Sequence, residues 1–186
     1  MKAKSPIETE IKLSAGAVES ARRLLRRAGF RVHRRRVFED NEILDTPSLR
    51  LRRDGTLLRL RRARGEVVLT YKGRAIAGKH KSREELESSV GEWDAMVAIA
   101  ARLGFEKVFR YQKYRTEFRV RGSSGLATLD ETPIGVYIEL EGSPAWIDRT
   151  ARRLGFNETD YITDSYGRLY LEWCRKRRVK PGDMVF

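Results

Sequence analysis

The N-terminal part of the chain contains the stretch Ile7-Glu8-Thr9-Glu10-Ile11-Lys12-Leu13. Its charged residues alternate with uncharged ones, and this period of two predicts a β-strand with one charged face. On that face the Cα atoms of Glu8 and Glu10 are about 6.6 Å apart and their carboxylates point the same way, so they repel each other. A divalent cation between them would remove the conflict, since hard cations prefer several carboxylate oxygens. The plainer alternative is a surface strand with a solvated charged face, and the stretch taken alone favours it.

The composition points to an anionic partner. The chain has 186 residues, 35% of them charged, and a formal net charge of +13. Such a balance favours nucleic acid, phosphorylated small molecules or an anionic membrane surface as a partner. Cys174 is the only cysteine, which excludes an intramolecular disulfide and fits a reducing compartment. The longest strongly apolar run, 95–101, is too short to cross a bilayer, and the sequence shows no secretory signal pattern. We therefore expect a soluble, cytoplasmic protein with no membrane partner.

The rest of the chain is expected to form strands and helices of a single domain. Helices are expected over 15–28, 91–103, 144–154 and 166–177. Strands are expected over 49–53, 57–62, 67–72, 82–90, 107–121, 126–130 and 135–141, and the stretch 30–44 is expected to be extended. Segment 73–81 is expected to be a mobile loop that exposes His80. We place the domain at 1–178 and a frayed tail at 179–186.

The polar faces of these strands are almost entirely charged, and both signs recur at every second residue. The acidic members are Glu8, Glu10, Glu85, Glu87, Asp130, Glu139 and Glu141, and the basic members are Lys12, Arg59, Arg61, Lys72, Arg83, Lys113 and Arg115. This pattern predicts an α+β fold, a closed antiparallel β-barrel with a charged lumen and with helices packed outside. A barrel of about eight strands has room for one small ligand. Charges at that depth are costly unless they are paired or ligated.

These side chains also indicate what the lumen would bind. Arginine and lysine side chains recognise phosphate oxygens. Carboxylate clusters hold Mg²⁺ or Mn²⁺, which can bridge phosphates. The combination predicts a polyphosphate bound together with a metal. A nucleic-acid binder is the alternative without catalysis, because arginine runs occur within 22–27, 34–36, 50–53 and 175–178, although no helix-turn-helix, zinc or RNP-like motif accompanies them.

Several short motifs follow one another along the chain. They are Glu8-x-Glu10-x-Lys12, Asp45-Thr46-Pro47, Leu58-Arg59-Leu60-Arg61, Thr70-Tyr71-Lys72-Gly73, Arg83-x-Glu85-x-Glu87, Lys113-x-Arg115, Leu129-Asp130-Glu131, Glu139-x-Glu141 and Ser165-Tyr166. Each is weak alone, but the ordered set covers nearly the whole chain and resembles the CYTH domain, or triphosphate tunnel metalloenzyme, superfamily. That superfamily includes class IV adenylate cyclases, thiamine triphosphatases, inorganic triphosphatases and fungal RNA triphosphatases.

The resemblance implies an eight-stranded tunnel that holds a triphosphate and uses Mg²⁺ or Mn²⁺. The metal ligands implied by it, directly or through water, are Glu8, Glu10, Asp130, Glu139 and Glu141, with Glu85 for a second metal. The phosphate contacts implied by it are Lys12, Arg59, Arg61, Lys72, Lys113 and Arg115, with Arg83 as a further contact. Within this set, Glu8, Glu10 and Lys12 are expected to be the catalytic residues.

A triphosphatase is the favoured function, acting on inorganic triphosphate or an organic triphosphate such as ATP or thiamine triphosphate. Hydrolysis needs no nucleotide pocket, and no stretch of the sequence indicates one. The close alternative is a class IV-like adenylate cyclase, which would convert ATP to cyclic AMP and pyrophosphate. A non-catalytic polyphosphate- or nucleic-acid-binding protein is the third possibility. For the favoured function we expect no nucleic-acid partner, and the sequence leaves the oligomeric state open, a homodimer included.

Overall fold

The computed structural model describes residues 7–186. Its strands are β1 (Ile7–Ser14), β2 (Arg31–Asp45), β3 (Leu57–Ala63), β4 (Glu66–Lys72), β5 (Lys81–Val90), β6 (Glu106–Arg119), β7 (Leu126–Thr132) and β8 (Gly135–Glu141). Its helices are α1 (Val18–Arg27), α2 (Arg50–Arg53), α3 (Trp93–Arg102), α4 (Pro144–Arg153) and α5 (Tyr166–Arg177), with a short 3₁₀ helix at Glu158–Asp160. In this described range no helix is both long enough and apolar enough to span a membrane.

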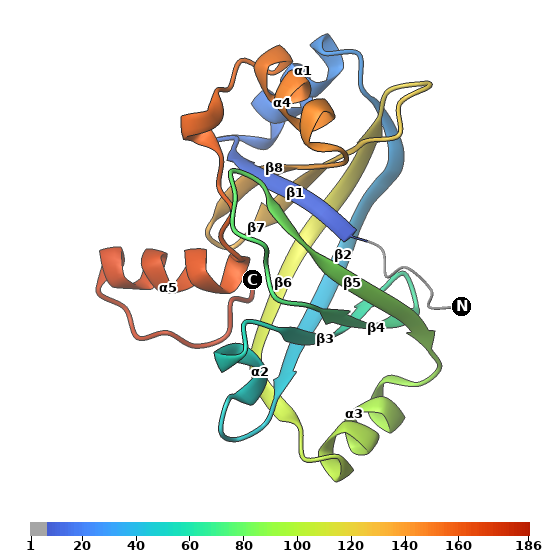
Figure 1. The fold of residues 1–186 in the computed structure, drawn as a ribbon, viewed down its shortest axis with the longest axis vertical. Helices are drawn as coiled ribbons and strands as arrows, with labels where there is room; N and C mark the ends of the chain where they lie inside the picture. The colour runs from blue at the N-terminus through green and yellow to red at the C-terminus, as the bar shows by residue number, and fades with distance from the viewer. Residues whose placement is uncertain (1–6) are drawn as a thin grey trace.

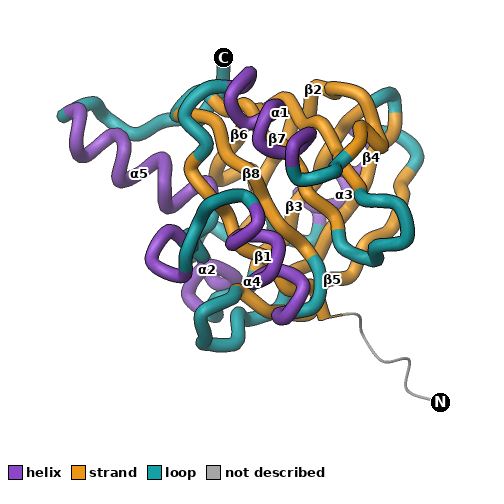
Figure 2. Tube along the Cα trace, turned by 90° about the horizontal axis from the view of Figure 1, so that it is seen from above, coloured by secondary structure: helices purple, strands orange, loops and turns teal. Residues whose placement is uncertain are grey.

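The eight strands form a closed barrel in the order β1-β5-β4-β3-β2-β6-β7-β8 (Figure 2). Every neighbouring pair is antiparallel. β1 closes the ring, since it pairs with β5 through residues 7–10 and with β8 through residues 10–14. The predicted closed eight-stranded antiparallel barrel is therefore confirmed.

Apolar side chains on the outer faces of the strands pack against the helices. Ile11 and Leu13 of β1 are fully buried beneath α1 and α4, which lie together at one end of the barrel (Figure 1). At the opposite end α3 covers Leu60 and Val67 of β3 and β4. Removing apolar surface from water stabilises the fold by about 25 cal/mol per Å². Because successive side chains on a strand point to opposite faces, the charged residues between these apolar ones point into the barrel.

The segment expected to be a short strand at 49–53 is helical instead. Leu49, just before α2, has a φ of 55° in the left-handed region. The buried carboxylate of Asp45 accepts hydrogen bonds from the backbone N–H groups of Thr46, Leu51 and Arg52, at 2.7, 2.9 and 2.9 Å. These bonds satisfy donors at the helix start that would otherwise lack partners. A contact from outside the segment therefore decides its conformation.

Two segments expected to be loose contain residues that are held in place. The expected loop is present at 73–80, but Lys81 already belongs to β5 and His80 is only 8% exposed, so the prediction of an exposed histidine is wrong. In the C-terminal tail Met184 is 1% exposed. Its N–H donates to the Arg110 carbonyl, and its carbonyl accepts from the Gln112 N–H, both at 2.9 Å. The tail thus bridges the free edge of β6, and the prediction of a frayed tail is also wrong.

Close packing between the β6–β7 hairpin and α4 requires a glycine at position 125. A Cβ there would lie 2.2 Å from Cε2 of Trp146, whose indole N–H donates to Ser123 Oγ at 2.8 Å. We expect Gly125→Ala to lower the free energy of unfolding by about 1–3 kcal/mol, because the indole or the hairpin must shift. The melting temperature should fall by about 2–4 °C per kcal/mol. Gly91→Ala is the matched control, since a Cβ there meets nothing within 4 Å. Equal melting temperatures for the two variants would contradict this packing role.

Candidate active site

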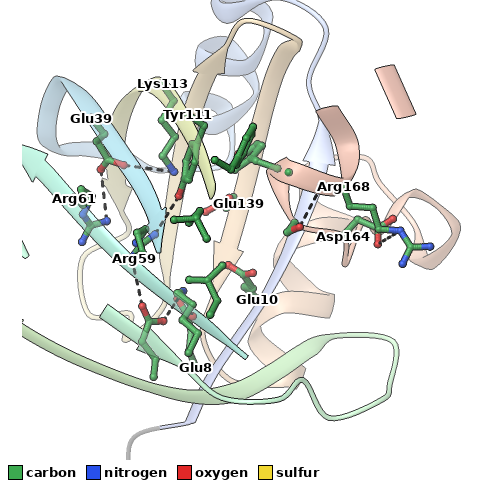
Figure 3. Close-up of a pocket in the computed structure, with 18 of the residues that line it drawn as sticks. Glu8, Glu10, Glu39, Arg59, Arg61, Tyr111, Lys113, Glu139, Asp164 and Arg168 are labelled. Atoms are coloured by element: carbon green, nitrogen blue, oxygen red, sulfur yellow. Dashed lines mark hydrogen bonds and ion pairs between the residues drawn. The ribbon is translucent and has the colours of Figure 1, made fainter. Parts of the chain in front are cut away.

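The barrel encloses a cavity of about 1770 Å³. Side chains from every strand except β7 line it, and residues at the start of α5 line one of its mouths. Figure 3 shows charged side chains from several strands converging on this space. The cavity is therefore the lumen that the alternating charges predicted.

Charged side chains of both signs surround the lumen. Those that bear on the site are basic at Lys12, Arg59, Arg61, Lys72, Lys81, Arg83, Lys113 and Arg115, and acidic at Glu8, Glu10, Glu39, Glu85, Glu87, Asp130, Glu139 and Glu141. Every site residue predicted from the sequence is in this set. All of them except Asp130 line the cavity directly. The structure thus brings the predicted residues together, whereas their individual roles remain predictions.

One wall of the lumen, formed by β1, β5 and β8, is acidic. Glu10 lies directly opposite Glu141 in the β1–β8 ladder, an unfavourable arrangement for like charges. Glu8 and Glu85 both accept hydrogen bonds from Lys72 Nζ at 2.7 Å. Burial and the adjacent Glu8 raise the pKa of Glu85 to about 7, and burial together with the charge of Glu8 raises the pKa of Glu141. This wall therefore holds more carboxylates than its own lysines neutralise.

Two lysines share one carboxylate on this wall. Lys12 Nζ lies 3.3 Å from Glu10 Oε1 and 3.4 Å from Glu139 Oε1, and Lys81 Nζ lies 3.4 Å from the same Glu10 oxygen. Burial opposes ionisation of Glu10, but attraction mainly from Lys12 lowers the pKa of Glu10 to about 2. Burial lowers the pKa of Lys81 to about 8, because a shared carboxylate compensates only partly for lost hydration.

The facing wall, formed by β2, β3 and β6, is basic. Arg59 Nη2 and Arg61 Nη2 each lie 3.3 Å from Glu87 Oε1. Glu39 Oε2 lies 3.6 Å from Lys113 Nζ, and Glu39 Oε1 lies 3.9 Å from Arg61 Nη1. Burial acts to raise the pKa of Glu39, but Lys113 and the neighbouring arginines lower it to about 2. These separations exceed the 2.7–2.9 Å typical of charge-assisted hydrogen bonds, so the arginines retain N–H groups for a ligand.

Asp130 lies behind the cavity wall and is fully buried. Its carboxylate accepts from Lys113 Nζ at 2.7 Å, from Arg115 Nε and Nη2 at 2.7 and 2.6 Å, and from the Tyr166 hydroxyl at 2.9 Å. Arg115 also contacts Glu139. Asp130 thus holds Lys113 and Arg115, which themselves line the cavity. Its role as a metal ligand stays a prediction.

Sequence reasoning missed three residues of the lumen. Lys81 extends the row of Arg83, Glu85 and Glu87 by one step of two residues, and this spacing could have revealed it had segment 73–81 not been expected to be a loop. Glu39 begins a row that continues with uncharged residues, which hid it. Tyr166 stands in the Ser165-Tyr166 motif, but the motif assigns it no role, since its hydroxyl donates to an aspartate 36 positions away.

The acidic wall has the donor chemistry that a hard divalent cation prefers. Among residues 7–186, no three acidic, histidine or cysteine side chains meet as a ready-made ion site. Lysines contact these carboxylates instead, as Lys72 does with Glu8 and Lys12 with Glu10. Mg²⁺ is commonly bound by one or two carboxylates, with water and substrate phosphates completing its coordination. Glu8 and Glu10, with Glu141 opposite, fit that mode of binding.

Comparisons with known proteins agree with this architecture. The structure of a Pyrococcus horikoshii protein is 29% identical with a TM-score of 0.74, and the match covers 89% of this chain and 98% of that one. A Hippeastrum protein, described as a candidate adenylyl cyclase with a dominant triphosphatase activity, is 19% identical with a TM-score of 0.67, covering 89% and 95% of the two chains. A candidate adenylate cyclase of Methanocaldococcus jannaschii is 28% identical over 138 residues, 74% of this chain and 77% of that protein.

A family model also matches most of the chain. The model that matches is that of the CYTH domain, over residues 6–166. This range includes all eight strands and every charged residue named above as bearing on the site. The chain therefore belongs to the CYTH domain family.

Proposed function

We propose that this protein is a divalent-metal-dependent triphosphatase that hydrolyses tripolyphosphate or an organic triphosphate inside its tunnel. The observation that carries the proposal is the basic wall facing the acidic wall across one closed lumen. CYTH domain enzymes act on triphosphate substrates with the help of a divalent metal. The Hippeastrum protein of the same fold is described as having a dominant triphosphatase activity.

The basic wall would hold the phosphates. Phosphoryl transfer needs mainly positioning and charge neutralisation, and a triphosphate carries up to four negative charges. Arg59 and Arg61 offer planar guanidinium groups that match phosphate oxygens two at a time. Their shared partner Glu87 is 43% exposed at its side chain, so a phosphate can displace it into water at little cost. Lys113 and Arg115, held by Asp130, would bind the same phosphate chain.

The acidic wall would complete the site. A divalent cation bound by Glu8 and Glu10 would supply neutralisation of phosphoryl charge and a fixed orientation of the substrate. If these carboxylates bound the cation, Lys72 would keep Glu85 and Lys12 would keep Glu139, but each lysine would lose one of its two carboxylate partners. Each ammonium group could then donate an N–H to a phosphate oxygen at the same place. The lumen thereby exchanges internal ion pairs for ion pairs with its substrate.

An adenylate cyclase is the second candidate, favoured by aromatic side chains at one mouth of the tunnel. Phe109 and Tyr170 line the cavity there, with ring centroids 5.9 Å apart. Such rings can stack a purine base. In this reaction the 3′-hydroxyl of ATP would attack the α-phosphorus and pyrophosphate would leave. The relative in Methanocaldococcus jannaschii is named as a candidate for this activity.

Product analysis tests the proposal against its rivals. Purified protein is incubated with Mg²⁺ or Mn²⁺ and with tripolyphosphate, ATP or thiamine triphosphate. Orthophosphate release is the expected result. Cyclic AMP with pyrophosphate would identify a cyclase instead. No turnover, combined with tight and salt-sensitive RNA binding, would favour a binding protein.

The acidic strand is tested by Glu8→Gln/Glu10→Gln. We expect metal-dependent phosphate release to fall on the order of a hundredfold or more, because neutral amides no longer attract the cation. Circular dichroism and the melting temperature should show that the variant still folds. Glu19→Gln on the exposed side of α1 is the matched control and should keep full activity. Full activity in the double variant would exclude these residues as metal ligands.

The raised pKa of Glu85 predicts how stability depends on pH without metal. Burial beside Glu8 shifts this pKa from its ordinary value of 4.5 to about 7. Between these values the folded state binds more protons than the unfolded state, so stability falls as pH rises, and the loss is complete above pH 7. Glu85→Gln removes this titration. Its melting temperature relative to the unmodified protein should therefore be higher at pH 8 than at pH 5, by about 2–4 °C per kcal/mol.

Thermal unfolding in EDTA at the two pH values measures this difference. Glu92→Gln, at an exposed position, is the control and should show no pH-dependent gain. If Glu85→Gln changed the melting temperature equally at pH 5 and pH 8, the pKa of Glu85 would not be raised in the folded state.

A further inference from the structure

A polar cluster lies outside the barrel, beside the loop between β4 and β5. Asp148 of α4 accepts from the Tyr161 hydroxyl at 3.1 Å, and its two oxygens contact His80 Nε2 and Lys79 Nζ, each at 2.8 Å. Lys79 Nζ also reaches Glu158 Oε1 at 2.8 Å. We call these five residues the clasp. None of them lines the tunnel, and the proposed reaction uses none of them.

The inner part of the clasp is largely covered, whereas the side chains of Lys79 and Glu158 at its edge are 47% and 57% exposed. The side chains of His80 and Asp148 are 7% and 15% exposed. Burial acts to raise the pKa of Asp148, but hydrogen bonds from Lys79, His80 and Tyr161 lower it to about 2. The rings of His80 and Tyr161 lie 5.9 Å apart. A half-buried carboxylate that accepts from both His80 and Tyr161 helps to fix the positions of these two side chains.

Among the described residues, the clasp lies next to the pair of neighbouring strands with the fewest register pairs. Within the described residues β1 and β5 share four register pairs, fewer than any other two neighbouring strands, and the last pair is Glu10 opposite Lys81. Beyond this point β1 pairs with Ile162, through Lys12 N–H to Ile162 O at 2.8 Å and Ile162 N–H to Lys12 O at 2.9 Å. His80 directly precedes β5, and Tyr161 directly precedes Ile162. The clasp therefore ties together the two segments that follow one another along the edge of β1.

The register of the β1–β5 pairing decides where Lys81 points. Successive side chains on a strand alternate between faces, so His80 faces α4 outside while Lys81 faces the lumen. A slip of one residue would exchange the two faces. In the observed register Lys81 is 9% exposed, lines the cavity and lies 3.4 Å from Glu10. Anchoring His80 outside thus holds the lysine inside.

We infer that Lys81 is an additional phosphate-binding residue of the tunnel, and that His80 and Asp148 are positioning residues that hold it there from outside the barrel. This inference rests on the proposed function, because a cation at this position matters only when a phosphate chain enters the lumen. Lys81 shares its carboxylate oxygen with Lys12. Lys12 keeps Glu139 when Glu10 turns to a metal, whereas Lys81 is left to pair with phosphate.

Steady-state kinetics with tripolyphosphate and Mg²⁺ test the inference through a double-mutant cycle. Lys81→Met should raise KM about tenfold with a smaller change in kcat, because it removes one charge-assisted contact to bound substrate. His80→Ala should raise KM by a smaller factor. In the double variant KM should match that of Lys81→Met to within about twofold, because His80 acts through Lys81. If the fold increases in KM of the two single variants multiplied in the double variant, the positioning role of His80 would be overturned.

Hydrogen exchange in EDTA supplies a readout that does not depend on turnover. His80→Ala and Asp148→Asn should speed exchange of the amides of residues 81–84 by about tenfold, since the short β1–β5 pairing opens more often. His80→Gln should keep the exchange rates and the KM of the unmodified protein, because the glutamine amide can still donate to Asp148. Asp94→Asn, at an exposed position on α3, is the matched control and should change neither.

The outcomes separate the inference from the proposed function. Unchanged exchange and unchanged KM in both clasp variants, in an enzyme that still hydrolyses tripolyphosphate, would overturn the inference and leave the proposed function intact. Failure of the unmodified protein to turn over any triphosphate would overturn both.

Discussion

Charge neutralisation inside a closed barrel is the constraint on which the rest of this structure depends. Charged side chains of both signs surround the lumen, and a buried charge costs several kcal/mol unless it is paired. The strands meet this requirement by alternating signs, as where Lys12 lies between Glu10 and Glu139. Because the inner faces carry the charges, the apolar faces turn outward and need helices to cover them. The helices at both ends and at the side of the barrel are thus a consequence of what lies inside (Figure 1).

The same balance explains how the tunnel could accept a highly charged substrate. A triphosphate alone would add negative charge beside carboxylates that already repel each other, such as Glu10 and Glu141. Together with a divalent cation it would disturb the balance much less, because carboxylates could bind the cation while lysines and arginines bound the phosphates. The contacts of Arg59, Arg61 and Lys113 with Glu87 and Glu39 are long enough for this exchange, whereas those of Lys113 and Arg115 with Asp130 are short. Under the proposed function, substrate and metal would replace the long contacts.

Features set by neighbouring residues could be predicted from the sequence, whereas features set by contacts between distant residues could not. Alternation in 7–13 and in the later strands is a local property, so the barrel, its charged lumen and the rows of site residues could be predicted from it. Helix α2 depends on hydrogen bonds to Asp45, which lies outside the helix. The strand predicted at 49–53 from local sequence was therefore wrong. His80 and Asp148 are 68 positions apart, and only the folded chain shows that they hold the start of β5. The missed features are those held by distant partners and not by a repeating pattern.

A crystal structure with Mn²⁺ and a slowly hydrolysed imido analogue of tripolyphosphate tests the proposed function most directly, because anomalous scattering locates the manganese independently of the atomic model. The analogue should lie inside the barrel with its oxygens on Arg59, Arg61 and Lys113. The manganese should lie between it and the carboxylates of Glu8 and Glu10, with Lys72 turned from Glu8 to a phosphate. Analogue and metal bound outside the barrel, with the ion pairs of the lumen unchanged, would contradict the proposed role of the tunnel.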